Sequence, residues 1–190
     1  MTPELRLMVA PALTYARLAR QPSPVGPITA LRRPLLAAVV LGVAIAIAAT
    51  GHVTPALVVS TTLCWALVIV LQIAIALILI AGPSRRTVGI PRALDLFFAS
   101  HTPWSLWLLA AAVVPAPLGR PLAPLLPLAV VPLVLTTRMI VAFFREVLQL
   151  DSRRALLRTV AHQAITWTLF GVLYGSAVAL RPRILQWLGW

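Results

Sequence analysis

The sequence has few charged residues and almost no acidic ones. Charged side chains make up 11% of the 190 residues, four of them are Asp or Glu, and lysine is absent. A soluble globular domain carries about 25% charged residues, so this chain has too few polar groups to cover a surface that faces water. The composition therefore excludes an ordinary soluble enzyme or soluble binding domain.

Residues that carry chemistry are equally scarce. The single cysteine, Cys64, lies within an apolar run, which excludes a disulfide framework, and we interpret it as a core-packing residue. The sequence has no HExxH, GxSxG or P-loop motif, which disfavours hydrolase and kinase chemistry. All four acids are expected at the inner membrane surface: Glu4, Asp95, Glu146 and Asp151. We therefore predict that the protein is not an enzyme and has no catalytic residues, no metal and no cofactor.

Apolar residues, in contrast, dominate the chain. They make up 61% of it and give a mean hydropathy of +0.97. Several apolar runs approach or exceed the ~20 residues with which a helix crosses the ~30 Å hydrocarbon core. We predict an all-α polytopic membrane helix bundle with about five transmembrane helices, at residues 35–51, 56–81, 94–118, 122–144 and 159–180.

Prolines make the fourth predicted span ambiguous. Six of them fall between Pro115 and Pro132. This region either crosses the membrane with kinks, because neighbouring helices can satisfy the carbonyls that prolines leave free, or forms a re-entrant hairpin. A hairpin would leave three or four true spans, and both alternatives remain open.

The two ends of the chain are predicted to lie at the membrane surface. Residues 1–33 form an amphipathic segment and a linker, in which Arg6, Arg17 and Arg20 share one sector of a helix that Pro11 interrupts. Residues 183–190 form an interfacial tail that carries tryptophans.

Arginines set the predicted orientation. With five spans and a cytoplasmic N-terminus, thirteen arginines lie inside and three lie outside, which strongly favours an external C-terminus. We expect a multi-pass protein of the inner (cytoplasmic) membrane of a bacterium. The arginines lie between apolar runs, so they are predicted to bind the lipid bilayer and its anionic headgroups, and no nucleic acid. The expected headgroup-binding residues are Arg32, Arg33, Arg85, Arg86, Arg138 and Arg145.

Small and polar residues suggest which helix faces make contacts. Small residues at four-residue spacing predict close helix packing on two faces: Ala38, Gly42 and Ala46 on the first, and Gly171, Gly175 and Ala179 on the second. The second predicted span carries a polar face that we expect to look into the protein, formed by Ser60, Thr61, Cys64 and Gln72.

Two histidines are the sharpest chemical signal. His101 and His162 are expected at similar depth near the inner face, where two facing imidazoles could ligate a haem iron from either side. The competing interpretation is that they are interfacial histidines without a ligand. Neither helix has glycines that would make room for a porphyrin at that depth.

Two inner-loop segments resemble a known family. Residues 89–103 (GIPRALDLFFASHTP) form an amphipathic stretch that runs to a proline before the third span, and residues 149–155 (QLDSRRA) precede the last span. Together with the predicted topology, they are similar to the Yip1-like family of five-span membrane proteins. The proline-rich fourth span departs from that pattern. The resemblance implies vesicle traffic and small GTPases for eukaryotic members, whereas bacterial members mostly lack an assigned role.

Three functions fit these observations. We expect a non-catalytic accessory or scaffolding subunit that packs against the helices of other membrane protein subunits in a larger complex. The alternative is a small transporter or channel, or a lipid-binding membrane protein; a transport path would be lined by Ser60, Thr61, Gln72, Gln163 and Thr166. A second alternative is a haem- or quinone-binding redox subunit.

Overall fold

The computed structural model describes residues 2–21, 25–50, 54–113 and 127–187, and within these ranges every regular element is a helix. This confirms the predicted all-α class. The elements are α1 (Pro3–Val9), α2 (Pro11–Arg20), α3 (Pro27–Thr50), α4 (Pro55–Ser84), α5 (Ile90–Ala99), α6 (Thr102–Val113), α7 (Val130–Ala142), the π-helical turn η3 (Phe143–Val147) and α8 (Ser152–Trp187).

Three segments are long and apolar enough to cross a membrane. They are Pro27–Ala44 in α3, Pro55–Ser84 in α4 and Pro127–Val147 around α7. They overlap the first, second and fourth predicted spans, and they indicate a membrane protein. The other two predicted spans and the orientation of the termini stay predictions.

The predicted third span is divided into two helices. The chain leaves α5 at Ser100 and enters α6 at Thr102, and residues 114–118 lie outside the described residues. Pro103 has no N–H, so it cannot donate to the carbonyl four residues earlier. The Thr102 hydroxyl donates to that Ala99 carbonyl instead, at 2.9 Å. A continuous helix was therefore the wrong expectation here, and the break places His101 between the two helices.

Helix α3 begins earlier than the first predicted span. It starts at Pro27, and Pro34 lies inside it. Proline is favoured at the first position of a helix because its missing N–H would have no intrahelical partner there. Arg32 and Arg33 consequently belong to the helix rather than preceding it, and Arg33 can reach neighbouring helices.

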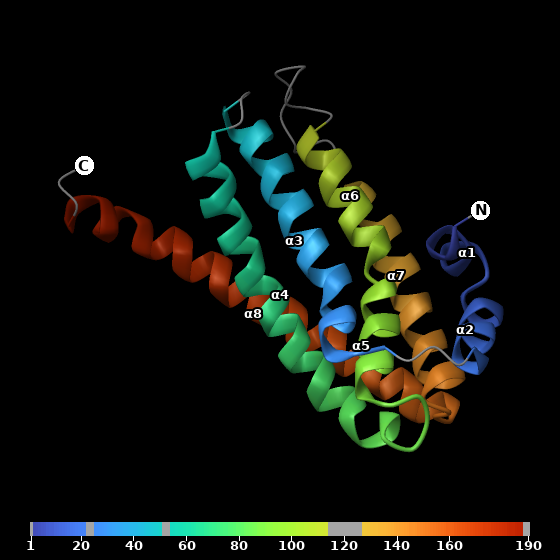
Figure 1. The fold of residues 1–190 in the computed structure, drawn as a ribbon. Helices are drawn as coiled ribbons and strands as arrows, with labels where there is room; N and C mark the ends of the chain where they lie inside the picture. The colour runs from blue at the N-terminus through green and yellow to red at the C-terminus, as the bar shows by residue number, and fades with distance from the viewer. Residues whose placement is uncertain (1, 22–24, 51–53, 114–126, 188–190) are drawn as a thin grey trace.

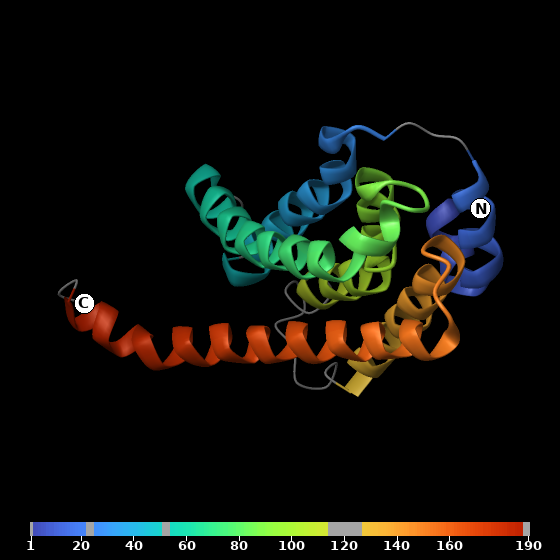
Figure 2. The same ribbon diagram turned by 90° about the horizontal axis from the view of Figure 1, so that it is seen from below.

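The helices α3, α4, α6 and α7 run side by side as a bundle (Figure 1). Helix α8 starts at the base of the bundle, which we define as the end next to the α4–α5 connection, and its C-terminal half extends away from the other helices in both ribbon views (Figure 2). The pair α1–α2 lies against α7 and η3. The structure is thus a bundle with one projecting helix.

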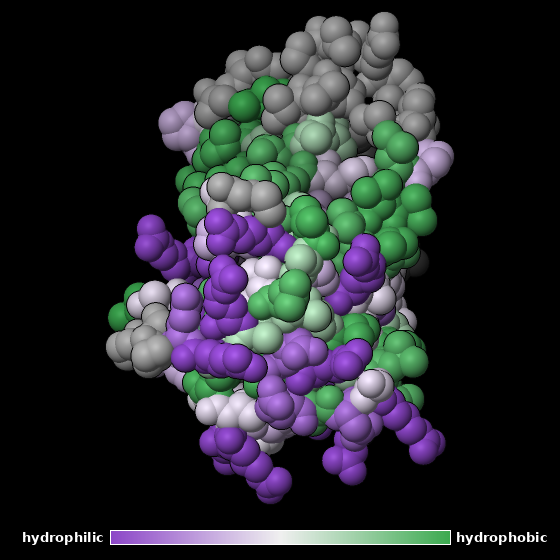
Figure 3. Space-filling model, turned by 90° about the vertical axis from the view of Figure 1, so that its right-hand side faces the viewer, coloured by the Kyte–Doolittle hydropathy of each residue, from purple (hydrophilic) through white to green (hydrophobic). Residues whose placement is uncertain are grey.

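The best-packed core lies at the base. Phe97 on α5 contacts Phe143 on η3 edge-on, with ring centroids 5.6 Å apart, and Tyr15 on α2 contacts Phe143 at 5.8 Å. All three side chains are fully buried. On the α1–α2 side of the molecule, hydrophilic residues gather over this base and hydrophobic residues cover the part above it (Figure 3). This separation suits a protein whose base lies at a membrane surface.

Candidate functional site

A cavity of about 450 Å³ opens between α3, α4, α6 and α8. Most of its lining is apolar, with Leu41 from α3, Ile69 from α4 and Leu108 from α6 as examples. Polar side chains from α7 and α8 and from the α5–α6 break also line it. Cavities of this size and character are typical of small-molecule sites in proteins.

Two histidines meet in the wall of this cavity. The rings of His101 and His162 contact edge-to-face, with centroids 5.3 Å apart and an interplanar angle of 73°. The Phe97 ring packs against both imidazoles, with its centroid 5.0 Å from that of His101 and 5.1 Å from that of His162. His101 is 9% exposed and His162 is 1% exposed. The structure therefore brings together the two histidines that the sequence placed at similar depth.

Several buried polar atoms beside the cavity have no hydrogen-bond partner among the described residues. They are Nε2 of His101, both ring nitrogens of His162, and the hydroxyls of Thr136 and Thr166. Of the four ring nitrogens of the two histidines, Nδ1 of His101 is the one that has partners in the described residues: the Ser100 hydroxyl at 3.2 Å and the Phe97 carbonyl at 3.3 Å. A buried polar group without a partner costs about 1–3 kcal/mol. Native proteins normally satisfy such groups with protein, water or a bound molecule.

Aromatic side chains line the cavity on two of its sides. Trp104 on α6 and Trp167 on α8 contact each other, with ring centroids 5.2 Å apart, and both belong to the lining. The Trp167 indole donates to Gln163 at 3.2 Å, and the Gln163 amide donates to the Thr137 hydroxyl at 3.2 Å. This chain of hydrogen bonds joins α8 to α7 and fixes the indole beside the cavity.

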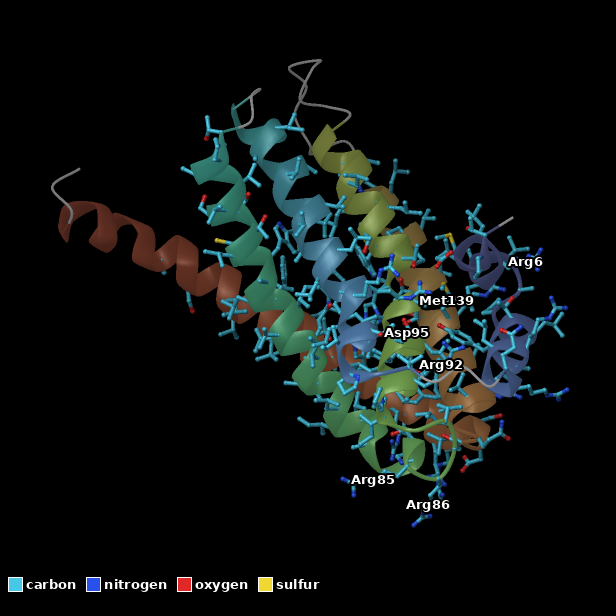
Figure 4. The ribbon with its side chains drawn as sticks, viewed as in Figure 1. Arg6, Arg85, Arg86, Arg92, Asp95 and Met139 are labelled. Atoms are coloured by element: carbon cyan, nitrogen blue, oxygen red, sulfur yellow. The ribbon has the colours of Figure 1, made fainter. Side chains whose placement is uncertain are left out.

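Arginines and acids form a second polar group, which we call the ion cluster: Glu4, Arg33, Arg92 and Asp95. Arg33 contacts Glu4 at 2.7 Å and Asp95 at 2.8 Å, and Arg92 contacts Asp95 at 3.3 Å. Figure 4 shows Arg92 and Asp95 close together inside the molecule. Glu4 and Arg33 also line the cavity. Both carboxylates of the cluster therefore have a cationic partner.

Two ionisable groups of the N-terminal helices respond to these surroundings. Partial burial raises the pKa of Glu4, but the hydrogen bond and charge of Arg33 outweigh it, so the pKa lies below its ordinary value. Burial raises the pKa of Tyr15 above its ordinary value. The neutral phenol donates to the Leu96 carbonyl at 3.1 Å and ties α2 to α5.

The predicted headgroup-binding arginines separate into two groups. Arg33 is held in the ion cluster, whereas the other five side chains are exposed: Arg32, Arg85, Arg86, Arg138 and Arg145. In Figure 4, Arg85 and Arg86 point away from the bundle at its base. Exposure leaves these five able to meet lipid headgroups, and that role stays a prediction.

The two predicted small-residue faces also differ. On α3, Ala38 and Ala46 are buried, and a Cβ atom added to Gly42 would lie 2.8 Å from the Thr62 backbone. On α8, a Cβ atom added to Gly171 or Gly175 would meet nothing within 4 Å. Ala179 on the same helix is exposed. The first face is used within the chain, and the second has no neighbour among the described residues.

The predicted polar face of α4 is only partly internal. Thr61 donates to the Gly42 carbonyl at 2.8 Å, and Gln72 lines the cavity. Ser60 and Cys64 are exposed, so the interpretation of Cys64 as a core residue was wrong. Ser60 donates to the Leu57 carbonyl of its own helix at 3.0 Å and needs no interior partner. A small polar residue in an apolar helix is thus a weak sign of burial.

The histidine geometry does not favour haem. Two axial histidines bind iron from opposite faces of the macrocycle, so the porphyrin plane must lie between them. Here the rings touch edge-to-face at 5.3 Å, with no such gap. Among the described residues, no group of three or more His, Cys, Asp or Glu side chains could hold a metal ion.

Sequence reasoning found part of the site and missed the rest. Five sequence candidates line the cavity: Gln72, His101, His162, Gln163 and Thr166. Thr136 and the ion cluster were missed. Thr136 had no signal, because a threonine in an apolar run gives no indication of which helix it faces. The spacing of Arg92 and Asp95, three residues apart on one helix, could have predicted their ion pair.

Comparison with family models, curated proteins and solved structures finds no match to this chain.

Proposed function

We propose that this protein binds an amphipathic small molecule from the bilayer in the cavity between α3, α4, α6 and α8. One observation carries the proposal: buried, unpartnered polar atoms of His101, His162 and Thr136 adjoin a cavity whose walls are otherwise mainly apolar. The apolar walls suit a hydrocarbon portion, and the polar atoms suit a hydrogen-bonding head. This is the lipid-binding alternative from the sequence, with this cavity proposed as its location.

The size and position of the cavity support a molecule that arrives through the membrane. Its volume of about 450 Å³ falls in the range of small-ligand sites, about 300–1,000 Å³. Two of the walls, α3 and α4, include segments that are long and apolar enough to cross a membrane. A molecule already dissolved in the bilayer would reach such a site without crossing water.

Filling the cavity tests this function. Ala37 on α3 lines the cavity, and Ala74 on α4 is exposed and does not line it. We expect the wild-type protein and A74F, purified in mild detergent, to retain an extractable amphipathic molecule that mass spectrometry detects. A37F should retain at least several-fold less. Equal retention by A37F and A74F, or no retained molecule in the wild type, would overturn the proposal.

A second candidate function is the accessory or scaffolding subunit. The observation that favours it is the projecting half of α8, where Gly171 and Gly175 have no neighbour within 4 Å of an added Cβ atom. Exposed small residues let another helix approach closely in a membrane. We expect the double variant G171L/G175L to lose protein partners that co-purify with the wild type. Gly82 is also open at its Cβ position, so G82L is the matched control. Partners retained by the double variant would count against this candidate.

The five-span topology remains part of the proposal. The distribution of arginines supports a cytoplasmic N-terminus and an external C-terminus. Single cysteines introduced at Arg86 and Arg183 in a C64A background should differ in labelling by a membrane-impermeant maleimide on intact cells. Labelling at 183 but not at 86 is the expected result. The Yip1-like resemblance predicts the same orientation, so the opposite pattern would count against both.

A further inference from the structure

The charges around the cavity restrict the kind of head group that it can hold. Glu4 and Arg33 are its charged lining residues, and they pair with each other at 2.7 Å while Arg33 also pairs with Asp95 at 2.8 Å. The described lining therefore offers no unpaired cation. A phosphate or carboxylate head would be buried without a counter-charge, which is strongly unfavourable. An uncharged head is the better fit.

The unpartnered atoms define the polar chemistry of that head. Nε2 of His101, both ring nitrogens of His162 and the Thr136 hydroxyl have no hydrogen-bond partner among the described residues, and they lie buried in the cavity wall, in side chains that are 9%, 1% and 1% exposed. A neutral imidazole has one N–H donor and one acceptor nitrogen, and a hydroxyl can do either. Such a mixed set can donate to a carbonyl oxygen and accept from a hydroxyl group, so it suits a head that carries either group.

The aromatic lining defines the shape of the head. Phe98, Trp104 and Trp167 line the same cavity as the histidines, and Trp104 and Trp167 lie in edge contact. Aromatic faces favour a second flat ring at a centroid distance of about 4.5–7 Å. A benzene molecule fits in a cavity of about 150 Å³. The volume of about 450 Å³ leaves room for a substituted ring and the first part of an apolar tail.

From these three restrictions we infer that the cavity binds a quinone or quinol: a flat ring that carries neutral carbonyl or hydroxyl oxygens and an apolar tail. The ring oxygens hydrogen-bond to His101, His162 and Thr136, and the ring packs beside Trp104 and Trp167. The tail extends along the apolar walls of α3 and α4. This inference rests on the proposed function and names the class of ligand for the same cavity.

The binding of decylubiquinone tests the inference. This probe has a ring with two carbonyls and a ten-carbon tail, and decylbenzene has a ring and the same tail without the oxygens. We expect saturable quenching of tryptophan fluorescence when decylubiquinone is added to the full chain in detergent. Decylbenzene should compete for the site at least about tenfold more weakly, which corresponds to about 1.4 kcal/mol.

Variants separate a role of the polar atoms from a loss of folding. H162F removes two unpartnered nitrogens, and T136V removes one hydroxyl at nearly constant shape. Each should weaken decylubiquinone binding several-fold or more. T168V is the matched control, because Thr168 on α8 is exposed and does not line the cavity. Unchanged affinity in both H162F and T136V would overturn the inference even if H162F folded poorly.

The possible outcomes distinguish this inference from the proposed function. If decylbenzene binds as tightly as decylubiquinone, the cavity takes an apolar molecule and the quinone class is wrong. If the wild-type protein retains a phospholipid that A37F loses, the proposed function stands and the inference falls. If neither probe binds and nothing co-purifies, both fail.

Discussion

Two groups of polar side chains contribute residues to the same cavity lining, one partly exposed and one buried, and they differ in how well they are partnered. In the ion cluster, Arg33 bridges Glu4 and Asp95, and Arg92 adds a further contact to Asp95. In the histidine group, which we define as His101, His162 and Thr136, four buried nitrogen or oxygen atoms have no partner among the described residues. Helix α5 and the break after it supply members of both groups.

This difference assigns a structural role to the ion cluster and fits the ligand-binding role that we propose for the histidine group. The ion cluster joins α1, α3 and α5, so its hydrogen bonds and charges are used to hold three helices together. The histidine group makes few such links, and its polar atoms lie beside a cavity. A fold that leaves polar atoms buried and unpaired gives up about 1–3 kcal/mol for each. A ligand that satisfies them recovers part of that energy on binding.

Of the substitutions proposed for unfolding measurements, removal of Asp95 from the ion cluster should lower the free energy of unfolding most. D95A leaves Arg33 and Arg92 without their shared carboxylate in a place where Asp95 is only 9% exposed. Breaking a buried ion pair costs about 3–5 kcal/mol. We expect a loss of unfolding free energy near the lower end of that range, because Arg33 is partly exposed. Denaturation by SDS in mixed micelles measures it.

Asp151 provides the control for that prediction. It pairs with Arg154 on the surface at 3.2 Å, and both side chains are more than half exposed. The exposed pair contributes about 0–1 kcal/mol, but Asp151 also accepts a hydrogen bond from the Arg154 backbone N–H at 2.9 Å and so caps α8. D151A should therefore cost about 0.5–2 kcal/mol, less than D95A. Equal losses in D95A and D151A would show that the ion cluster is not a structural centre.

A smaller effect is expected at Tyr15, a buried side chain outside the ion cluster whose hydroxyl also has a hydrogen-bond partner. Y15F keeps the buried ring against Phe143 but removes the hydrogen bond to the Leu96 carbonyl. A neutral hydrogen bond of this kind contributes about 0.5–1.5 kcal/mol. We expect a loss of that size in the same unfolding measurement. If Y15F left the free energy of unfolding unchanged or raised it, water would have to replace the phenol as the donor to this carbonyl.

A substitution in the histidine group should change the free energy of unfolding in the opposite direction. T136V exchanges a buried hydroxyl that has no partner for a methyl group of nearly the same shape. Without ligand, we expect the stability to stay equal or to rise by up to about 1 kcal/mol, because an unsatisfied group is removed. With bound ligand, the variant should gain less stability than the wild type. A large loss of stability without ligand would assign Thr136 to the structural side of the comparison.

The sequence predicted the features that depend on local pattern. Long apolar runs identify the membrane-crossing segments, because length and hydropathy alone decide that property. The similar depth of His101 and His162 followed from their positions near the ends of two predicted spans. The break before Pro103 is also a local feature, and the Thr-Pro pair at its start could have predicted it.

The features that depend on helix packing could not be predicted. Arg33 and Asp95 are 62 residues apart, so their contact exists only because α3 and α5 pack together. The same holds for Thr136, whose direction depends on how α7 and α8 meet. Exposed Ser60 and Cys64 show the converse, since polarity on one helix does not reveal which part of that helix a neighbour covers.

Acid pH should weaken the ion cluster slightly, and this is the smallest effect we expect. The pKa of Glu4 is lower in the folded protein than its ordinary value of 4.5, because Arg33 stabilises the carboxylate despite partial burial. The ion pair therefore adds its stability above the unfolded pKa and loses it as the pH falls through the folded pKa. Both side chains are about one-third exposed, so solvent screening keeps the effect below about 1 kcal/mol.

Thermal unfolding in detergent between about pH 7 and about pH 3 measures this contribution, because the loss continues below the ordinary pKa of Glu4. E4Q removes the titrating carboxylate, so its stability should fall less over that range than that of the wild type. The difference should also shrink at high salt, because ions screen a partly exposed pair. An identical pH dependence in E4Q would show that the contact between α1 and α3 contributes nothing measurable. The stability of the ion cluster would then rest on Asp95 and its two arginines alone.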